Sequence, residues 1–208
     1  MDYVFDRFEK MAPQLIKALE RRNHAAYYAA SKEEARDIAL SLIPKGSSVG
    51  WGGSMSMMAS GIIPELEKGD YTLLDRAKTD DVGHLQREIF FADFFLGSTN
   101  ALSEDGILVN IDGNGNRIGA MAFGPKNVIL FVGRNKVVKT ADDAYRRAKY
   151  TAAPINAGRF DIKTPCQVTG ECADCISPDN ICCEVLTIRF SRVKGRIKII
   201  LVNEDLGF

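Results

Sequence analysis

Residues 94–133, FFLGSTNALSEDGILVNIDGNGNRIGAMAFGPKNVILFVG, decide the fold that this sequence predicts. One apolar run ends at Gly97, and a second run, residues 128–132, ends at Gly133. Short continuous apolar runs of this kind are typical of buried strands. Hydroxyl, amide and carboxylate side chains follow the first run, in residues 98–106. Because ligands of open α/β sheets bind beyond the carboxyl ends of strands, we expect a small-molecule site here.

A hairpin is predicted between these two strands. Apolar residues alternate with polar ones over 107–111, which is the pattern of a half-buried strand. Residues 112–116 consist only of Asp, Gly and Asn, which favour or tolerate the positive φ angles of tight turns. We therefore expect residues 117–120 to form the returning strand.

Further strands are expected on both sides of this region. Apolar and alternating stretches predict strands at 25–30, 47–51, 71–74, 185–193 and 197–202. The last two are expected to form a hairpin, or a pair in one sheet connected by a helix. A Lys194-Gly195 turn separates them.

Four longer helices are predicted, one before the first strand and three between strands. The first spans 3–22, where Pro13 should kink or divide it, and the second spans 31–42 behind a Ser31/Glu34 capping box. The third spans 79–91 with Thr79 as its cap, and the fourth is opened by Thr140 or Asp142, runs to about 153 and is ended by Pro154. Alternating strands and helices indicate a mainly parallel sheet that is covered on both faces. With the hairpin added, the predicted fold is α/β with a mixed sheet.

Composition narrows the class of protein. The chain has 208 residues, of which 46% are apolar, and its 27 basic residues balance 27 acidic ones. A general nucleic-acid binder needs a basic face, so we expect no nucleic-acid partner, and Arg146-Arg147-Lys149 is expected to be a solvated helix face. No apolar run reaches the roughly 18 residues of a membrane span. We expect a cytoplasmic protein, and the apolar stripe of the first helix favours core packing or a homo-oligomer contact.

A glycine turn precedes a second candidate binding element. Gly52-Gly53-Ser54 joins the strand predicted at 47–51 to a helix that starts near Met55. A strand, a glycine turn and a helix start form a natural anion site, although the segment matches neither a Walker loop nor Gly-x-Gly-x-x-Gly. A tight turn with core methionines explains the same residues equally well.

The segment GSTNALSEDGILVNIDGNGNRIGAMAFGPKNVILFVGRNKVV resembles the signature of the LUD family, which includes lactate utilisation protein C. The pieces Gly-Ser/Thr-Asn-Ala, Glu-Asp-Gly, Asn-x-Asp-Gly-x-Gly-Asn-Arg and Gly-Pro match in order. The resemblance runs from about Trp51 to the cysteines near the end. It implies a fold like that of sugar-phosphate isomerases (NagB/RpiA) and CoA transferases, and a role in lactate utilisation. We expect one domain over 1–208, with an N-terminal helical segment 1–22 and a Cys-rich loop 160–183.

Two residues are candidates for catalysis. Glu104 is the strongest candidate for a reactive carboxylate, because CoA transferases of the implied fold form a thioester on a glutamate. His84, within the helix predicted at 79–91, can change charge near neutral pH and act as a general base, although a lone helical histidine is more often structural.

The candidate substrate-binding residues follow the predicted strands. Arg117 can hold a substrate carboxylate in a bidentate fork or form a salt bridge with Asp112. Lys136 resembles the Gly-x-Asn-Lys of the family and is expected to contact an anion. The full set is Gly52, Gly53, Ser54, Ser98, Thr99, Asn100, Asp112, Arg117 and Lys136.

All five cysteines lie in residues 166–183, with the spacing C-x5-C-x2-C-x6-C-C. Cys-x2-Cys lets two thiolates reach one metal, so Cys166, Cys172, Cys175 and either Cys182 or Cys183 are predicted to bind zinc or an iron–sulfur cluster. Reduced cysteines packed as small apolar groups are the alternative. The segment also resembles the Cys-rich tail of short LUD proteins. No nucleotide fingerprint is present.

Three functions remain open from the sequence. The first is a LUD protein of lactate or organic-acid utilisation that binds a small anionic metabolite, as a component of an oxidoreductase assembly with other lactate-utilisation subunits. The second is a stand-alone CoA-ester transferase or sugar-phosphate isomerase-like enzyme. The third is a non-catalytic regulatory or assembly subunit that a metal stabilises.

Overall fold

The two apolar runs form neighbouring strands at the centre of a parallel sheet. The structure is a computed structural model that describes residues 2–208. In it, β4 (Phe94–Gly97) pairs with β7 (Asn127–Gly133), so that Phe94 lies opposite Asn127. The sheet has six parallel strands in the order β1-β10-β7-β4-β2-β3. The other four strands are β1 (Ala25–Ala29), β2 (Ser48–Trp51), β3 (Thr72–Leu74) and β10 (Ile197–Val202).

Strand β7 shows why the central strands are apolar throughout. Val128, Leu130 and Val132 pack into one hydrophobic core, and Ile129 and Phe131 pack into another on the opposite face. Successive side chains of a strand point to opposite faces, so a strand buried on both sides needs apolar residues at every position. This confirms the expected α/β sheet covered on both faces.

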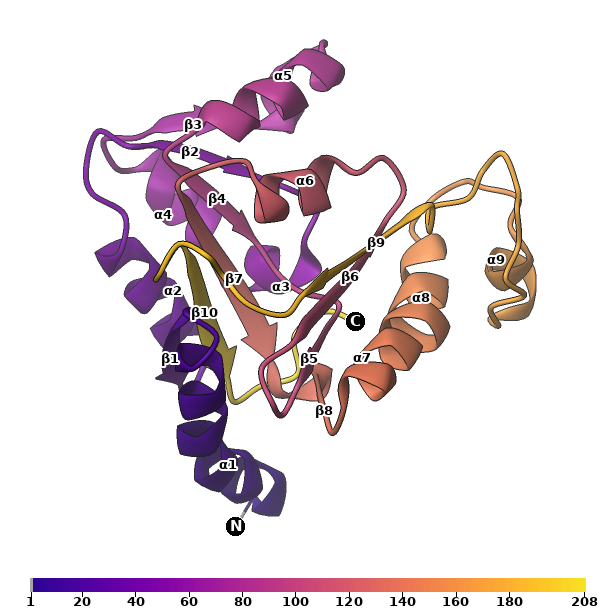
Figure 1. Cartoon of the computed structure of the whole chain (residues 1–208). Coiled ribbons are helices and arrows are strands. Elements are labelled where there is room, and N and C mark those ends of the chain that lie inside the picture. Colours follow the sequence, from indigo (N-terminus) through magenta and orange to yellow (C-terminus); the bar gives the residue numbers. More distant parts are fainter. Residues whose placement is uncertain (1) are drawn as a thin grey trace.

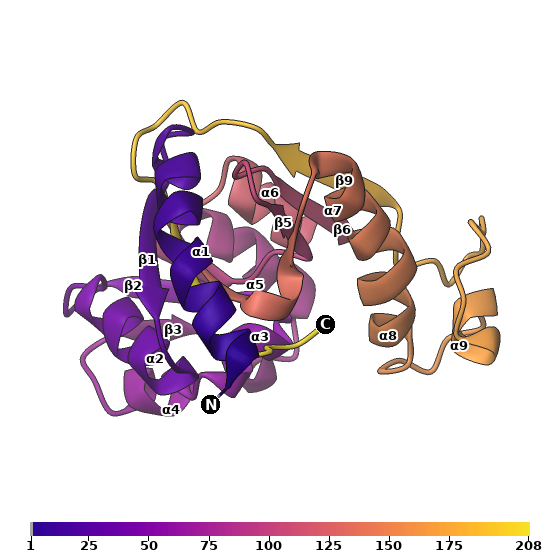
Figure 2. The same cartoon turned by 90° about the horizontal axis from the view of Figure 1, so that it is seen from below.

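One face of the sheet is covered by three helices. They are α2 (Lys32–Ser41), α3 (Met55–Ala59) and α4 (Ile62–Glu67), and all contribute buried side chains to one core. Helix α2 begins where the sequence predicted, because Ser31 Oγ accepts the Glu34 N–H. Helix α1 (Tyr3–Glu20) covers the opposite face (Figures 1 and 2).

A second, four-stranded sheet also lies on the α1 side. Its order is β8-β5-β6-β9, with β8 (Val137–Val138), β5 (Ala101–Ser103), β6 (Leu108–Asp112) and β9 (Glu184–Ile188). Leu102 and Leu108 pack into the α1-side core, whereas Val109 faces Ala144 and Ala148. The smaller sheet is therefore enclosed between the main sheet and the helical segment that begins with α7 (Ala141–Arg147).

The expected hairpin after residue 107 is wrong in its second half. Strand β6 pairs with β5 across the turn 104–106, and residues 116–122 form helix α6 (Asn116–Ala122) instead of a returning strand. Asp112 explains the difference, because its Oδ2 accepts the backbone N–H groups of Arg117 and Ile118 at 3.0 and 3.1 Å. Gly115 precedes the helix with a φ of 71°. The Asp/Gly/Asn segment thus starts a helix.

The predicted C-terminal strand pair is also wrong. Strand β9 ends at Ile188 and pairs antiparallel with β6, whereas β10 lies in the main sheet, parallel to β1 and β7. The segment between the two strands crosses from the smaller sheet to the main sheet, so β9 and β10 do not pair with each other. Ser191 in this segment donates its backbone N–H to the carbonyl of Arg22, just after α1.

Three predicted helix boundaries change. Helix α1 is continuous through Pro13, and its buried side packs on the sheet. Helix α5 (Val82–Glu88) is capped by Asp81, whose Oδ1 accepts the His84 N–H, so Thr79 is not its cap. Pro154 does not end the helix that begins with α7. A π-helix, Ala148–Ala152, continues it into α8 (Ala153–Ala157), and Pro154 lies in the first turn of α8.

The remaining helices are short. Three 3-10 segments occupy Arg76–Lys78, Ile89–Phe91 and Arg134–Lys136, and α9 is Pro165–Thr169. Helix α9 lies in the Cys-rich segment, which projects beyond α8 in both views of the fold (Figures 1 and 2). Among residues 2–208, none of the helices has both the length and the apolar character needed to cross a membrane.

Candidate functional site

A polar cavity of about 380 Å³ lies at the carboxyl ends of four neighbouring strands of the main sheet. The turns after β2, β3, β4 and β7 all contribute to it, as expected for an open α/β sheet. We call this cavity the anion cavity. Its polar and charged lining residues are Ser54, Ser56, Arg76, Gln86, Ser98, Thr99, Asn100, Asp112, Asn114, Asn116, Arg117, Lys136, Asn156 and Arg159.

Lys136 is unusual among the lining residues, because it is a lysine with only 4% of its surface exposed. Its Nζ donates to Ser98 Oγ at 3.1 Å and to the Thr99 carbonyl at 3.2 Å. Burial, and then the charges of Arg147 and Arg117, lower the pKa of Lys136 to about 7. Within residues 2–208 no carboxylate pairs with it, so its charge lacks a counterion from the protein.

Ser98 holds the ammonium group of Lys136 in place. The Ser98 hydroxyl donates to the Phe131 carbonyl at 2.6 Å, which leaves its oxygen free to accept from Lys136. Ser98 directly follows β4, and Lys136 ends the 3-10 turn that directly follows β7. Because β4 and β7 are paired, the fold brings these two residues together.

Arg117 organises the other side of the cavity floor. Its Nη2 donates to Asn100 Oδ1 at 2.9 Å and to the Ile111 carbonyl at 2.6 Å. Its Nη1 donates to Asn110 Oδ1 at 2.9 Å and to the Ser98 carbonyl at 3.3 Å. The Arg117 guanidinium, which we expected to hold a substrate carboxylate, thus donates to protein oxygens instead. Arg117 contributes positive charge to the cavity and fixes the loop 98–100 against β6.

Asp112 is the one carboxylate of the lining, and the protein already uses it. Its Oδ2 caps α6, and the Arg117 Nε lies 3.9 Å away. Four cations face this single acid: Arg76, Arg117, Lys136 and Arg159. The cavity therefore carries an excess of positive charge.

The structure brings together almost all of the predicted binding residues. Gly53, Ser54, Ser98, Thr99, Asn100, Asp112, Arg117 and Lys136 all line the cavity. Gly52 is the exception and lies behind Arg117, where an added Cβ would come within 3.2 Å of the arginine Cγ. Gly52 thus supports the site through packing.

The two catalytic candidates, Glu104 and His84, do not line the anion cavity. Glu104 lies in the β5–β6 turn, at the opposite end of that hairpin, where Lys139 Nζ contacts its Oε2 at 2.5 Å. His84 is exposed on α5, and its Nε2 lies 3.2 Å from Glu88 Oε1. Neither side chain is among the lining residues, so a catalytic role for either one stays a prediction.

Three arginines that the sequence analysis did not select complete the site. Arg76 follows β3 and could have been found by the rule that placed Ser98, since β3 also ends at this edge. Arg159 follows α8 and has no such sequence signal. Arg147, expected on a solvated face, instead donates to the carbonyls of Asn100 and Asn135 at 2.6 and 2.9 Å. Burial lowers the pKa of Arg147.

Comparisons with known proteins identify the fold and the family. The sequence model of the LUD domain matches residues 12–202. The chain belongs to the LUD domain family. This family is associated with lactate utilisation. The LUD fold of the chain resembles the crystal structure of a DUF162 family protein from Deinococcus radiodurans, with a TM-score of 0.55 and 14% identity over 93% of this chain and 97% of that one. No curated protein sequence matches the chain.

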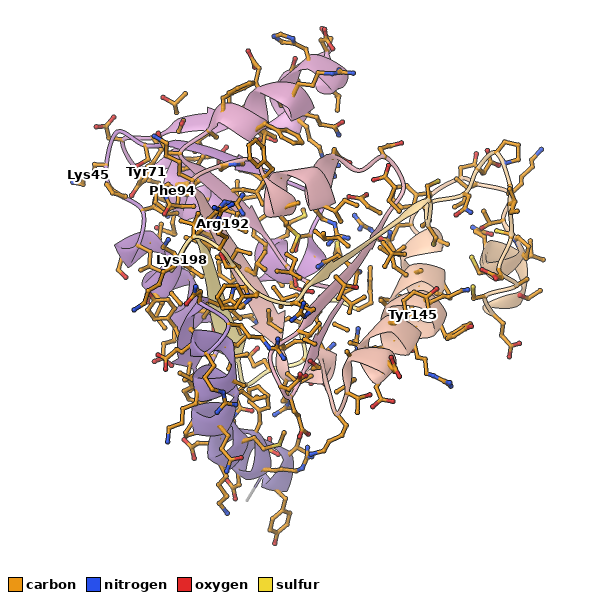
Figure 3. The ribbon with its side chains drawn as sticks, viewed as in Figure 1. Lys45, Tyr71, Phe94, Tyr145, Arg192 and Lys198 are labelled. Atoms are coloured by element: carbon orange, nitrogen blue, oxygen red, sulfur yellow. The ribbon has the colours of Figure 1, made fainter. Side chains whose placement is uncertain are left out.

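The LUD domain carries a second, smaller cavity on its Cys-rich side. This cavity of about 90 Å³, which we call the cysteine cavity, is lined by Cys166, Cys172, Cys175 and Cys182. Tyr145 on α7, labelled in Figure 3, and Lys149 on the π-helix also line it. Burial and the neighbouring cysteines raise the pKa of the Cys182 thiol to about 11. The two cavities share Ile111 and Ile181, so they are neighbours across those side chains.

The structure gives Cys182 and Cys183 different surroundings, which could not be told from the sequence. Cys182 faces the cysteine cavity, whereas Cys183 is exposed and its Sγ–H donates to the Asn180 carbonyl at 3.4 Å. All five cysteines are free thiols. Over residues 2–208, no three His, Cys, Asp or Glu side chains are already placed around a single metal ion.

Proposed function

We propose that this LUD protein binds a small organic-acid anion in the anion cavity, with the Lys136 ammonium as its principal contact. The buried, unpaired Lys136 carries the proposal. A buried ammonium normally has a carboxylate partner, because an isolated charge away from water is strongly unfavourable. Here the protein supplies only a hydroxyl and a carbonyl. A ligand carboxylate supplies the counterion.

The other cations of the cavity support the same class of ligand. Arg76 and Arg159 line it without a carboxylate partner among the described residues, and Arg117 adds charge from the floor. Clefts lined by one sign of charge concentrate ligands of the opposite sign. The association of the LUD family with lactate utilisation favours a carboxylate over other anions.

The size of the cavity sets an upper limit on the ligand. A volume of about 380 Å³ equals roughly a dozen water molecules, at about 30 Å³ each. Lactate has six non-hydrogen atoms, so a three-carbon acid would leave room for ordered water or for a longer acid. We propose a role for the chain in organic-acid utilisation that rests on this binding site.

The alternative of a CoA-ester transferase has weaker support. That mechanism needs a glutamate at the bound ester, and Glu104 is outside the cavity and paired with Lys139. The carboxylate within the cavity, Asp112, is engaged as the cap of α6. Binding of an organic acid requires neither residue to react.

The test compares Lys136→Met with Lys139→Met by calorimetric titration. The ligands are lactate, pyruvate, longer 2-hydroxy acids, glucose 6-phosphate and inorganic phosphate. Lys139 is the matched control because it is 77% exposed, lies three residues away and does not line the cavity. Loss of a hydrogen bond to a charged group costs about 1.5–3 kcal/mol, so we expect Lys136→Met to weaken carboxylate binding about tenfold to a hundredfold. Lys139→Met should bind like the natural chain.

Two results would contradict the proposal. One is equal carboxylate affinity in the natural chain and in Lys136→Met. The other is binding of glucose 6-phosphate or phosphate without any binding of carboxylates, which would move the site to the class of phosphate binders. Circular dichroism of both variants shows whether the fold is retained.

A further inference from the structure

We propose that Cys166, Cys172, Cys175 and Cys182 bind an iron–sulfur cluster of the [4Fe–4S] type, with one thiolate on each iron. The cluster would occupy the cysteine cavity, between the Cys-rich segment and the helical segment formed by α7, the π-helix and α8. On binding, each of the four thiols releases its proton and becomes a thiolate ligand.

The convergence of the four cysteines is the first support. They are spread over 17 residues of sequence, yet all four line a single cavity of about 90 Å³. Each is half-buried, and the fifth, Cys183, is exposed and directed at a backbone carbonyl. Free cysteines that served only as small apolar groups would have no reason to face one another across a cavity.

The second support is that the Cys-rich segment has almost no core of its own. Helix α9 has no buried residue, Val168 is 81% exposed and Ile176 is fully exposed. Ordering a segment costs conformational entropy, and a segment with few buried apolar contacts gains little free energy to offset that cost. Binding free energy at a thiolate site stabilises the folded form of such a segment, as in small metal-bound domains.

The spacing of the cysteines favours a cluster over a single ion. Zinc binds thiolates at about 2.3 Å in a tetrahedron, so its ligand sulfurs lie within about 4 Å of one another. In the described chain no three cysteines, or other ligand side chains, form such a group. A [4Fe–4S] cluster is wider, because each thiolate binds a different iron. Four cysteines around one cavity can supply one thiolate to each iron.

A neighbouring hydroxyl suits a thiolate ligand. Lys149 also lines the cavity, but its Nζ contacts Asp174 Oδ1 at 2.6 Å and Asp174 is itself a lining residue, so this pair adds no net charge. The hydroxyl of Thr164 lies 3.4 Å from the Cys166 sulfur, so it can donate to that sulfur when the thiol is deprotonated. Hydrogen bonds to cluster sulfurs and nearby charge are the means by which proteins adjust a cluster potential.

The cluster site would adjoin the anion cavity. Ile111 and Ile181 line both cavities, and α8 contributes Ala153 and Pro154 to one and Asn156 to the other. A bound cluster would therefore lie behind the wall of the anion cavity. The cluster proposal does not depend on the identity of the anion, since it uses none of the cations of that cavity.

The test is metal and acid-labile sulfide analysis of the full chain, purified without oxygen or reconstituted with ferrous iron and sulfide. We expect about four iron and four sulfide per chain, with the visible absorption of a cluster. The decisive pair is Cys182→Ser and Cys183→Ser, which differ by one position. Cys182→Ser should lose most of the iron and sulfide, and Cys183→Ser should retain them.

Each other outcome overturns the proposal. About one zinc per chain without sulfide would make the site a zinc site. Absence of both metals would leave the cysteines as thiols. Equal loss in both variants, or greater loss in Cys183→Ser, would refute the assignment of Cys182. Cys172→Ser is the second variant, and far-ultraviolet circular dichroism of each variant separates cluster loss from unfolding. These readouts do not involve anion binding, so they are independent of the Lys136 experiment.

Discussion

The floor of the anion cavity and the Cys-rich segment are neighbours, but they are built in opposite ways. On the floor, hydrogen bonds connect residues that are distant in sequence: Lys136 reaches Ser98, and Arg117 reaches Asn100. In residues 160–183, most hydrogen bonds join residues two to five positions apart, such as Asn180 with Cys175. The first region is fixed by the paired strands that carry it. The second has mostly local bonds and four thiols that line a cavity.

This difference separates two ways of making a site. The anion cavity is formed by the fold before any ligand arrives, and its positive charge is held there at a cost to stability. The cysteine cavity belongs to a segment that its own contacts order only weakly. Changes on the floor should therefore alter the stability of the whole domain, whereas changes in the Cys-rich segment should act locally.

The largest effect is expected for Arg117→Met. This change removes four hydrogen bonds to Asn100, Asn110, Ile111 and Ser98. Leaving buried acceptors without a partner costs about 1–3 kcal/mol each, and relief from the buried charge offsets part of this. We expect the free energy of unfolding to fall by about 3 kcal/mol, measured by urea denaturation. Arg146→Met, on the exposed face of α7, is the control, and an equal loss there would contradict the comparison.

A pH dependence from Lys136 is the next largest effect. Its pKa is about 7 in the folded protein and 10.5 in the unfolded chain, so the unfolded chain binds more protons between these values. Stability from this group therefore rises with pH from about 7 to 10, by about 1 kcal/mol per pH unit, and is constant below about pH 6.

Lys136→Met isolates this contribution. Urea denaturation of both proteins at pH 7, 8 and 9 should show Lys136→Met as the more stable at pH 7, with the difference shrinking as the pH rises. Parallel pH profiles for the two proteins would mean that the ammonium is not buried as described.

The smallest effect on global stability is expected for Cys172→Ser in metal-free protein. Because the Cys-rich segment has almost no buried apolar surface, the free energy of unfolding should change by less than about 0.5 kcal/mol. Hydrogen exchange should be fast over 160–183 and slow over β4 and β7. Slow exchange over both regions in the metal-free protein would remove the contrast between them.

The sequence predicted the parts of the site that directly follow buried strands. Ser98 and Lys136 were found because β4 and β7 are apolar throughout and their carboxyl ends share one edge of the sheet. Arg76 follows the same rule but was overlooked, since the strand before it is short. The four cysteines of the cysteine cavity were singled out by their spacing and by the resemblance to the Cys-rich tail of short LUD proteins, and metal binding by them stays a prediction.

Other parts depended on contacts between distant residues. The segment 112–116 has the composition of a hairpin turn, and only the side chain of Asp112, capping Arg117 and Ile118, makes it a helix start. Glu104 was a candidate because CoA transferases of the implied fold use a glutamate, but it lies in the far turn of a hairpin. Nothing in the local sequence tells which end of a hairpin faces a cavity.

The π-helix at Ala148–Ala152 has a consequence for how this site can vary among related chains. A π turn holds one residue more than an α turn, so it is what a single-residue insertion leaves in a helix. Because the π turn absorbs the extra residue, removing one residue there would restore an α turn and leave α8 facing as it does. Asn156 would stay in the anion cavity and Pro154 in the cysteine cavity. The helical segment can thus change in length by one residue at this point without rebuilding the wall that it gives to both sites.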